Sequence, residues 1–321
     1  MIYFNIILFA VESIFPPNLM LRKLTLLFSI CALTACATVR APDIRIPVTQ
    51  PLETLPKTPP RVALVLGSGG VRSFAALGVL KVLEENHIPI DLIVGASAGS
   101  LIGGLYADNP NIDALIPKML VLKPCDLLHI RLFNGSDGFD NGYTLQKFML
   151  KNLKAYNFDQ LKIKFVAVAT DFITGKTIPL VSGPIAPAVN ASSAFPSIFI
   201  PVFLYGHLLV DGGISDGVPV DVAKHYHPQL IIAVNAAPNP GNLTHRGIIA
   251  NITRAYLLQI KSFTRLQMQE ADIIIAPEVG TTWTFDFNAR RRMGEAGRQS
   301  ALAALPQIKK MLRAKKIALN R

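Results

Sequence analysis

The sequence predicts an α/β fold in which helices cover both faces of a mostly parallel central sheet. Short, uninterrupted apolar runs recur along the chain, and such runs are typical of parallel strands that are buried on both faces. Segments with helical spacing of apolar residues separate several of these runs, which is the alternation expected of a parallel sheet. The 321 residues, of which 50% are hydrophobic, suffice for one large domain.

The N-terminal residues 1–35 have the pattern of a secretory signal. Arg22 and Lys23 precede an apolar stretch at residues 24–33. We expect translation to start at Met20, because the residues before it contain no basic region of the kind that opens such a signal. A single transmembrane anchor is the alternative, although basic residues and prolines keep the apolar stretches below the roughly 20 residues that a span requires.

The sequence Leu-Thr-Ala-Cys at residues 33–36 resembles the lipobox of bacterial lipoproteins. By this resemblance, Cys36 becomes the acylated first residue of the mature protein. Ala37 after it favours the outer membrane of a Gram-negative cell envelope, with the protein facing the periplasm. Residues 36–60 then form a tether, because six prolines from position 42 onward favour an extended, semi-rigid chain.

The folded catalytic domain is expected at residues 61–289, beginning with a strand at 62–66. Further strands are expected at residues 92–94, 165–169, 208–210, 230–234 and 273–275. Helices are expected at residues 74–85, 100–107, 144–153, 220–225 and 248–269. Residues 203–210 have the pattern of a hairpin that turns at Gly206.

A basic helical segment is expected at residues 290–321, which hold ten lysines and arginines against Glu295 alone. The net charge of the whole chain is +11, so the rest of it is nearly neutral. A basic helix on a lipidated protein suggests contact with anionic lipid head groups, and a merely solvated helix face explains the pattern equally well. We expect no nucleic-acid partner, because an exported protein rarely meets one.

The pentapeptide Gly95-Ala96-Ser97-Ala98-Gly99 has the pattern of a nucleophile elbow, a sharp strand-to-helix turn that exposes its serine. Gly95 and Gly99 fit this interpretation, because neighbouring side chains would clash in so tight a turn. The start of the following helix would place backbone N–H groups beside an oxygen that develops negative charge. Ser97 is therefore a candidate nucleophile, although an ordinary tight turn also fits the pentapeptide.

The first predicted strand ends in a glycine-rich loop, Gly67-Ser68-Gly69-Gly70-Val71-Arg72. A dinucleotide fingerprint is excluded by Arg72 at its sixth position and by the lack of an acidic residue closing the second strand. A phosphate loop would need Gly-Lys followed by Ser or Thr, which this loop lacks. The remaining interpretation is a nest of amides that bind the oxyanion of a tetrahedral intermediate.

Ser97 needs a base, and Asp211 stands out because it ends an apolar run and precedes Gly212 and Gly213. A partly desolvated carboxylate at a strand end could accept the serine proton, since burial raises its pKa. Taken alone, Asp-Gly-Gly is also an ordinary turn. The histidines lie in no pattern that recommends one as a base; they are His87, His129, His207, His225, His227 and His245.

Together these motifs resemble the patatin-like phospholipase family. The resemblance covers about residues 61–235 and rests on G-S-G-G-V-R, G-A-S-A-G and D-G-G in that order; it extends to residues 78–80, 169–175 and 191–202. It implies a lipid acyl hydrolase with a Ser-Asp dyad, no catalytic histidine, no metal and no cofactor. The implied substrate is a phospholipid or lysophospholipid.

The resemblance also implies a role for each matching residue. Ser97 is the nucleophile and Asp211 the base. The implied oxyanion loop is formed by Gly67, Gly69, Gly70 and Val71, with Arg72 helping to fix it. The chain departs from the family's usual pattern at Ser73, at Ser197 and at residues 216–219, and none of these departures removes a reacting group.

Two other functions fit the same sequence. A conventional Ser-Asp-His esterase would use His225 or His227, which follow Asp211 in the chain. A lipid-binding lipoprotein without activity could also use this fold. The sequence does not decide between a hydrolase and an acyltransferase, which differ only in whether water or an alcohol resolves the acyl-enzyme.

Overall fold

The computed structural model describes residues 49–50, 58–129, 140–196, 198–237 and 248–320. The chain divides into two compact units, Met1–Ala41 and Pro42–Arg321, and every described residue belongs to the second. The predicted signal region, Cys36 and most of the predicted tether lie outside the described residues.

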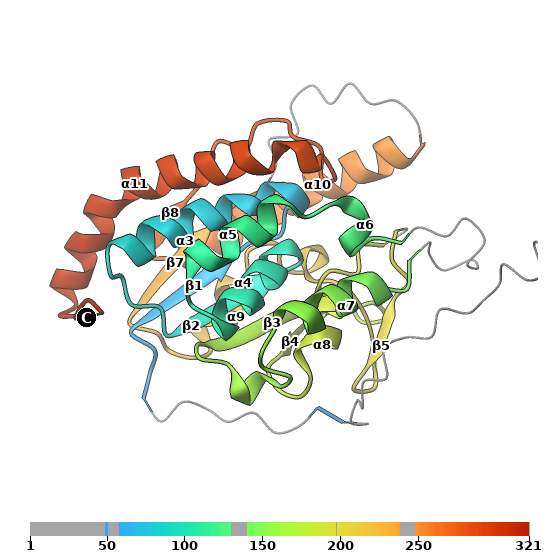
Figure 1. Cartoon of the computed structure of the whole chain (residues 1–321), viewed down its shortest axis with the longest axis horizontal. Coiled ribbons are helices and arrows are strands. Elements are labelled where there is room, and N and C mark those ends of the chain that lie inside the picture. The colour runs from blue at the N-terminus through green and yellow to red at the C-terminus, as the bar shows by residue number, and fades with distance from the viewer. Residues whose placement is uncertain (1–48, 51–57, 130–139, 197, 238–247, 321) are drawn as a thin grey trace, which may run out of the picture. The chain divides into compact units, whose positions relative to one another are not determined.

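The second unit is built on an eight-stranded mixed sheet (Figure 1). Five parallel strands lie in the order β3-β2-β1-β7-β8; their bounds are Lys164–Asp171, Leu92–Ala96, Val62–Leu66, Leu230–Val234 and Ile273–Ile275. Three antiparallel strands extend the β3 side: β4 (Thr177–Leu180), β6 (His207–Asp211) and β5 (Val202–Leu204). β5 and β6 form the predicted hairpin around Gly206.

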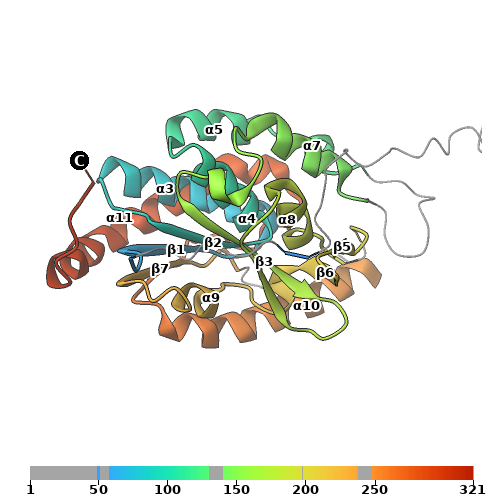
Figure 2. The same ribbon diagram turned by 90° about the horizontal axis from the view of Figure 1, so that it is seen from below.

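Helices cover both faces of this sheet, as predicted, and Figure 2 shows the two layers. One face carries α3 (Ala75–Glu85), α4 (Ala98–Asp108), α5 (Ile112–Leu120), α7 (Tyr143–Asn152), α8 (Ile185–Ser192) and α11 (Arg290–Ala314). The other carries α9 (Val220–Lys224) and α10 (Ile248–Gln267). The short α6 (Pro124–Leu127) follows α5.

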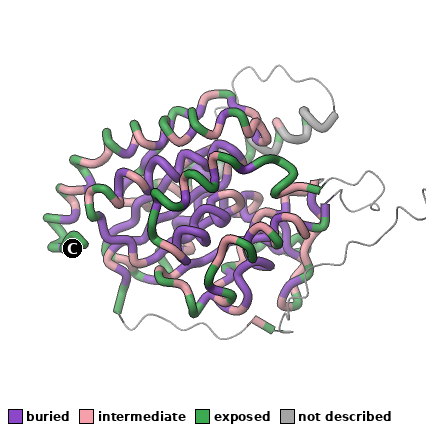
Figure 3. Tube along the Cα trace, in the orientation of Figure 1, coloured by how far each residue is buried: buried purple, intermediate pink, exposed green. Residues whose placement is uncertain are grey.

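The central strand β1 shows why its sequence is uniformly apolar. Its side chains alternate between the two faces: Val62, Leu64 and Leu66 belong to the large core beneath α3, whereas Ala63 and Val65 belong to the smaller core with α9. All five are buried, and Figure 3 shows how closely the buried positions follow the sheet and its inner helices.

The basic C-terminal segment is helical, and it is part of the folded domain. Met293, Ala301, Ile308 and Leu312 of α11 are buried, and a Cβ on Gly297 would collide with the carbonyl group of Ala75 in α3. The predicted boundary at residue 289 therefore does not separate two packed bodies, because α11 supplies one layer of the core.

The basic end of α11 lies at the amino edge of the sheet. Lys309 donates to Oδ1 of Asn86 after α3, and Lys315 pairs with Asp272 just before β8. The strands therefore point away from this end of α11. None of the described helices has the length and apolar character needed to cross a membrane.

Candidate active site

Ser97 lies in a sharp turn between β2 and α4. Its φ of 54° and ψ of −128° define a conformation that residues with a side chain rarely adopt. A Cβ on Gly99 would lie 2.8 Å from the carbonyl oxygen of Gly67, and one on Gly95 would lie 2.7 Å from the carbonyl oxygen of Gly99. The turn therefore requires glycine at both positions.

The pairing register brings Asp211 to Ser97. β2 ends at Ala96, which pairs with Val168 of β3, and Asp211 of β6 pairs with Ala169, the next residue along β3. Val168 and Ala169 both pair with β4 as well, so β4 occupies one side of β3 while β2 and β6 share the other. β2 and β6 thus meet end to end, the first at Ser97 and the second at Asp211.

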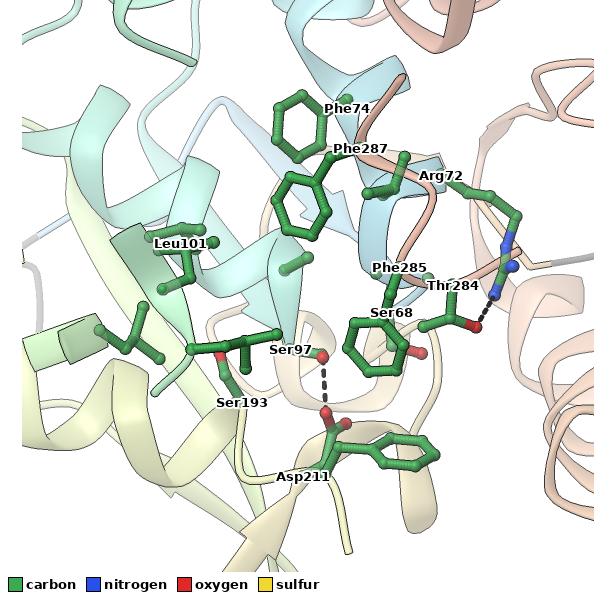
Figure 4. Close-up of a pocket in the computed structure, with 18 of the residues that line it drawn as sticks. Ser68, Arg72, Phe74, Ser97, Leu101, Ser193, Asp211, Thr284, Phe285 and Phe287 are labelled. Carbon is green, nitrogen blue, oxygen red and sulfur yellow. Dashed lines mark hydrogen bonds between the residues drawn. The ribbon is translucent and has the colours of Figure 1, made fainter. Parts of the chain in front are cut away.

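Ser97 Oγ donates a hydrogen bond of 2.5 Å to Oδ2 of Asp211 (Figure 4). Oδ1 of the same carboxylate accepts the Gly213 N–H at 2.7 Å. Asp211 is only 2% exposed, and this burial raises its pKa to about 6, against the opposing effect of the hydrogen bonds from Ser97 and Gly213. At neutral pH the carboxylate is ionised yet more basic than an ordinary aspartate, which suits a general base.

Only part of the glycine-rich loop has amides available to an anion. The Gly67 N–H donates to the Val234 carbonyl at 3.1 Å, and the Val71 N–H donates to the Thr284 carbonyl at 2.9 Å. The prediction that these two amides help to bind the oxyanion is therefore wrong, because both are already bonded to other carbonyls.

The two central amides of the loop remain available. Those of Gly69 and Gly70 donate to no acceptor among the described residues, and both residues line the same pocket as Ser97. Ala98 also lines this pocket, and its amide belongs to the first turn of α4, where backbone donors have no partner within the helix. These three N–H groups are the candidate oxyanion donors.

Arg72 acts on the loop from behind. Its side chain is 1% exposed and extends away from Ser97 (Figure 4). Nη1 donates to the Thr282 carbonyl at 2.6 Å and Nη2 to Thr284 Oγ1 at 3.4 Å. Burial lowers the pKa of Arg72 to about 10, so the group remains charged at neutral pH. Arg72 ties the loop to the segment before α11.

The pocket around Ser97 and Asp211 is mainly apolar. Its empty volume is about 860 Å³, including the open mouth. Its apolar walls come from six separate parts of the chain; they include Phe74, Leu101, Leu127, Leu128, Leu145, Phe195, Phe199, Phe285 and Phe287. Such a lining suits a hydrocarbon chain attached to the ester that Ser97 would attack.

No histidine among the described residues lines this pocket. His225 and His227 follow α9, on the far side of the sheet from α4. His207 instead contacts Asp171, with 2.7 Å between Nδ1 and Oδ2. His245 lies outside the described residues. The described geometry therefore gives Ser97 a carboxylate partner and no imidazole.

Several residues that hold and enclose the site were not predicted from the sequence. Ser192 accepts the Ser97 N–H at 3.1 Å and donates to the Val168 carbonyl at 2.6 Å; it lies inside the matching stretch 191–202, which was the available signal. Phe285 and Phe287 lie more than 70 residues after Asp211, in a segment without a motif. Only the three-dimensional packing reveals them.

Comparison with known proteins places these observations in a family. The sequence model of the patatin-like phospholipases matches residues 64–224, which include both Ser97 and Asp211. An uncharacterised NTE family protein of Mycobacterium tuberculosis is 35% identical over 179 residues, or 55% of this chain and 49% of its own length. The lysophospholipase NTE1 of Scheffersomyces stipitis is 32% identical over 179 residues, 54% of this chain and 12% of its own length. This chain thus spans about half the length of the mycobacterial relative.

Two solved structures are also similar. VipD from Legionella pneumophila has a TM-score of 0.42 and 14% identity, with 85% of this chain and 72% of that chain covered. The type III effector ExoU has a TM-score of 0.36 and 13% identity, with 78% and 54% covered. The family match includes the glycine-rich loop, the elbow and the aspartate. The chain therefore belongs to the patatin-like phospholipase family and has a patatin-like α/β fold.

Proposed function

We propose that this protein is a serine lipid acyl hydrolase that cleaves the acyl ester of a phospholipid or lysophospholipid. The observation that carries the proposal is the 2.5 Å hydrogen bond from Ser97 Oγ to Asp211 Oδ2 in a pocket with apolar walls. The matching family, the patatin-like phospholipases, and the lysophospholipase relative support the same class of substrate.

In the acylation step, Ser97 Oγ attacks the ester carbonyl carbon while its proton moves to Asp211 Oδ2. The carbonyl oxygen becomes an oxyanion, and the amides of Gly69, Gly70 and Ala98 are the donors placed to stabilise it. The tetrahedral intermediate then expels the alcohol part of the lipid. Asp211 returns the proton to this leaving oxygen, so the step yields an acyl-Ser97 ester and a neutral alcohol.

In the deacylation step, water takes the place of the alcohol. Asp211 accepts a proton from the water as its oxygen attacks the acyl carbon, and the oxyanion forms beside the same amides. When the intermediate collapses, the bond between the acyl carbon and Ser97 Oγ breaks and Asp211 returns the proton to Oγ. The products are a free fatty acid and the original enzyme.

The experiment is lipid product analysis with a panel of phospholipids and lysophospholipids. Wild-type protein is expected to release fatty acid, whereas Ser97→Ala should lower the rate by at least a thousandfold, because it removes the nucleophile. Asp211→Asn should be nearly as damaging, and the His225→Ala/His227→Ala double variant should keep activity within threefold. A double variant that loses several orders of magnitude would instead favour the Ser-Asp-His alternative.

We further propose that the protein acts at an envelope membrane to which Cys36 attaches it. The lipobox-like sequence at residues 33–36 supports this, and an acyl chain on Cys36 would keep the pocket near its lipid substrate.

A further inference from the structure

The segment between β8 and α11 forms one wall of the active-site pocket. Thr284, Phe285 and Phe287 all line it. These residues lie well outside residues 64–224, which match the family. The catalytic motifs therefore come from the matched region, whereas part of the surface facing the substrate comes from outside it.

This wall is fastened to the glycine-rich loop. The Thr284 carbonyl accepts the Val71 N–H at 2.9 Å, and Arg72 binds Thr282 and Thr284. The backbones are so close that a Cβ on Gly70 would lie 2.5 Å from the Thr284 carbonyl oxygen. The amides of Gly69 and Gly70 therefore belong to the same packed unit as the wall.

The wall also contacts the opposite side of the pocket. The rings of Phe285 and Phe195 meet edge to face, with centroids 6.2 Å apart and an interplanar angle of 88°. Figure 4 shows Phe285 beside Ser97 and Asp211, and Phe287 beside Phe74. Phe285 thus borders the space next to the reacting serine, and Phe287 borders the space beyond it.

We propose that Phe285 and Phe287 determine which acyl chains the enzyme accepts, and that Thr284 and Arg72 link the fit of the chain to the oxyanion loop. The inference rests on the proposed acyl hydrolase function. An acyl chain that packs against the rings of Phe285 and Phe287 holds the wall in place. The wall in turn holds the loop that presents the amides of Gly69 and Gly70. Chain preference should accordingly appear in kcat as well as in KM.

The first test measures kcat/KM for p-nitrophenyl butyrate, octanoate and dodecanoate. Phe285→Ala and Phe287→Ala should each lower the ratio of the dodecanoate to the butyrate value by about tenfold, the typical discrimination from one apolar contact in a pocket. Phe203→Ala is the matched control, because Phe203 is 72% exposed on β5 and should leave the ratio unchanged. An unchanged ratio in both pocket variants would overturn the proposal.

The second test asks whether the fit of the acyl chain is coupled to the oxyanion loop. Arg72→Lys, which cannot reproduce both guanidinium hydrogen bonds, should lower kcat for dodecanoate more than for butyrate. For dodecanoate, the fold-loss of kcat in the Arg72→Lys/Phe285→Ala double variant should be clearly smaller than the product of the fold-losses in the two single variants. Thr284→Val, which removes only the hydroxyl acceptor, is the second variant if Arg72→Lys does not fold. Multiplicative effects in the double variant would contradict the coupling.

A third measurement separates this inference from the proposed function. In a Ser97→Ala background, the dissociation constant of a fluorescent long-chain fatty acid should rise about tenfold with Phe285→Ala and stay constant with Phe203→Ala. This readout requires no hydrolysis. If fatty-acid binding depends on Phe285 but the protein that retains Ser97 hydrolyses none of the esters, the proposed function alone is refuted. If that protein hydrolyses the esters but fatty-acid binding does not depend on Phe285, the inference alone is refuted.

Discussion

Asp211 is the residue whose protonation should govern the reaction. As a base it must be ionised, and its pKa is raised to about 6 by burial. We therefore expect kcat/KM for a soluble ester to fall as the pH drops through about 6, with a tenfold loss per pH unit below it. Asp216, whose pKa is raised to about 7 by burial and by Asp221, provides the control. The Asp216→Asn variant should keep the acid limb of the kcat/KM profile, the fall in kcat/KM at low pH, near pH 6. An acid limb near 4 would contradict the account of Asp211.

The same raised pKa means that ionised Asp211 lowers the stability of the folded state. Its carboxyl group has a pKa of about 6 in the folded state and an ordinary value of 3.8, so the folded state holds the proton more tightly. Stability is therefore lost as the pH rises from 3.8 towards 6, by roughly 3 kcal/mol in total. Asp211→Asn removes this penalty and should unfold several degrees above wild type at pH 8. The difference should shrink at pH 4, and a lower melting temperature at pH 8 would refute the argument.

At the residue scale, the sequence indicated the groups with chemistry and missed their surroundings. Ser97 and Asp211 were recognisable because glycines mark the turns on which they lie. The amides of Gly67 and Val71 were misassigned, because a glycine-rich pattern does not reveal that Val234 and Thr284 supply acceptors for them. Such acceptors come from distant segments, and no local pattern encodes them.

At the element scale, the close packing of α11 on α3 gives a matched pair of substitutions. Gly297→Ala should destabilise the protein by about 2 kcal/mol or more, because its Cβ would collide with the Ala75 carbonyl. Gly294→Ala in the same helix has no atom within 4 Å of its Cβ, and alanine should be neutral or stabilising there by up to about 1 kcal/mol. Urea denaturation measures both. Equal effects would show that α11 does not pack on α3 as described.

The strands and long helices were predictable because their periodicity is clear. β7 and β8 have the predicted bounds, and α10 begins at the predicted residue. The helices α5 and α8 were not predicted, since they have only 9 and 8 residues and each contains a proline, Pro117 and Pro187. The 25 residues of α11 are long enough to be recognised as helical despite Pro306. The end-to-end meeting of β2 and β6 was also beyond prediction, because it depends on how both strands pair with β3.

At the scale of the whole molecule, the described unit separates its basic end from its reactive edge. Lys309 and Lys315 lie near the amino ends of the strands, whereas Ser97 follows the carboxyl end of β2. The 25 residues of α11 span about 37 Å between these regions. This separation supports our proposal that Cys36, and not the basic C-terminal end of α11, attaches the protein to a membrane.

This proposal predicts the outcome of cell fractionation. Cys36→Ser should move the protein from the membrane fraction to the soluble fraction, because one acylated residue is the proposed anchor. Cys125→Ser is the matched control, since Cys125 is an exposed free cysteine outside the lipobox-like sequence. Retention of the Cys36→Ser protein in the membrane fraction would refute lipidation as the anchor.

The central claim is that Ser97 is a nucleophile activated by Asp211 alone. The most direct measurement is labelling of the purified protein with a fluorophosphonate probe, followed by mass spectrometry of the labelled peptide. We expect one adduct on Ser97 in wild type, none in Ser97→Ala, a labelling rate at least a hundredfold lower in Asp211→Asn, and an unchanged rate in the His225→Ala/His227→Ala variant. An adduct on another residue, or undiminished labelling of Asp211→Asn, would contradict it.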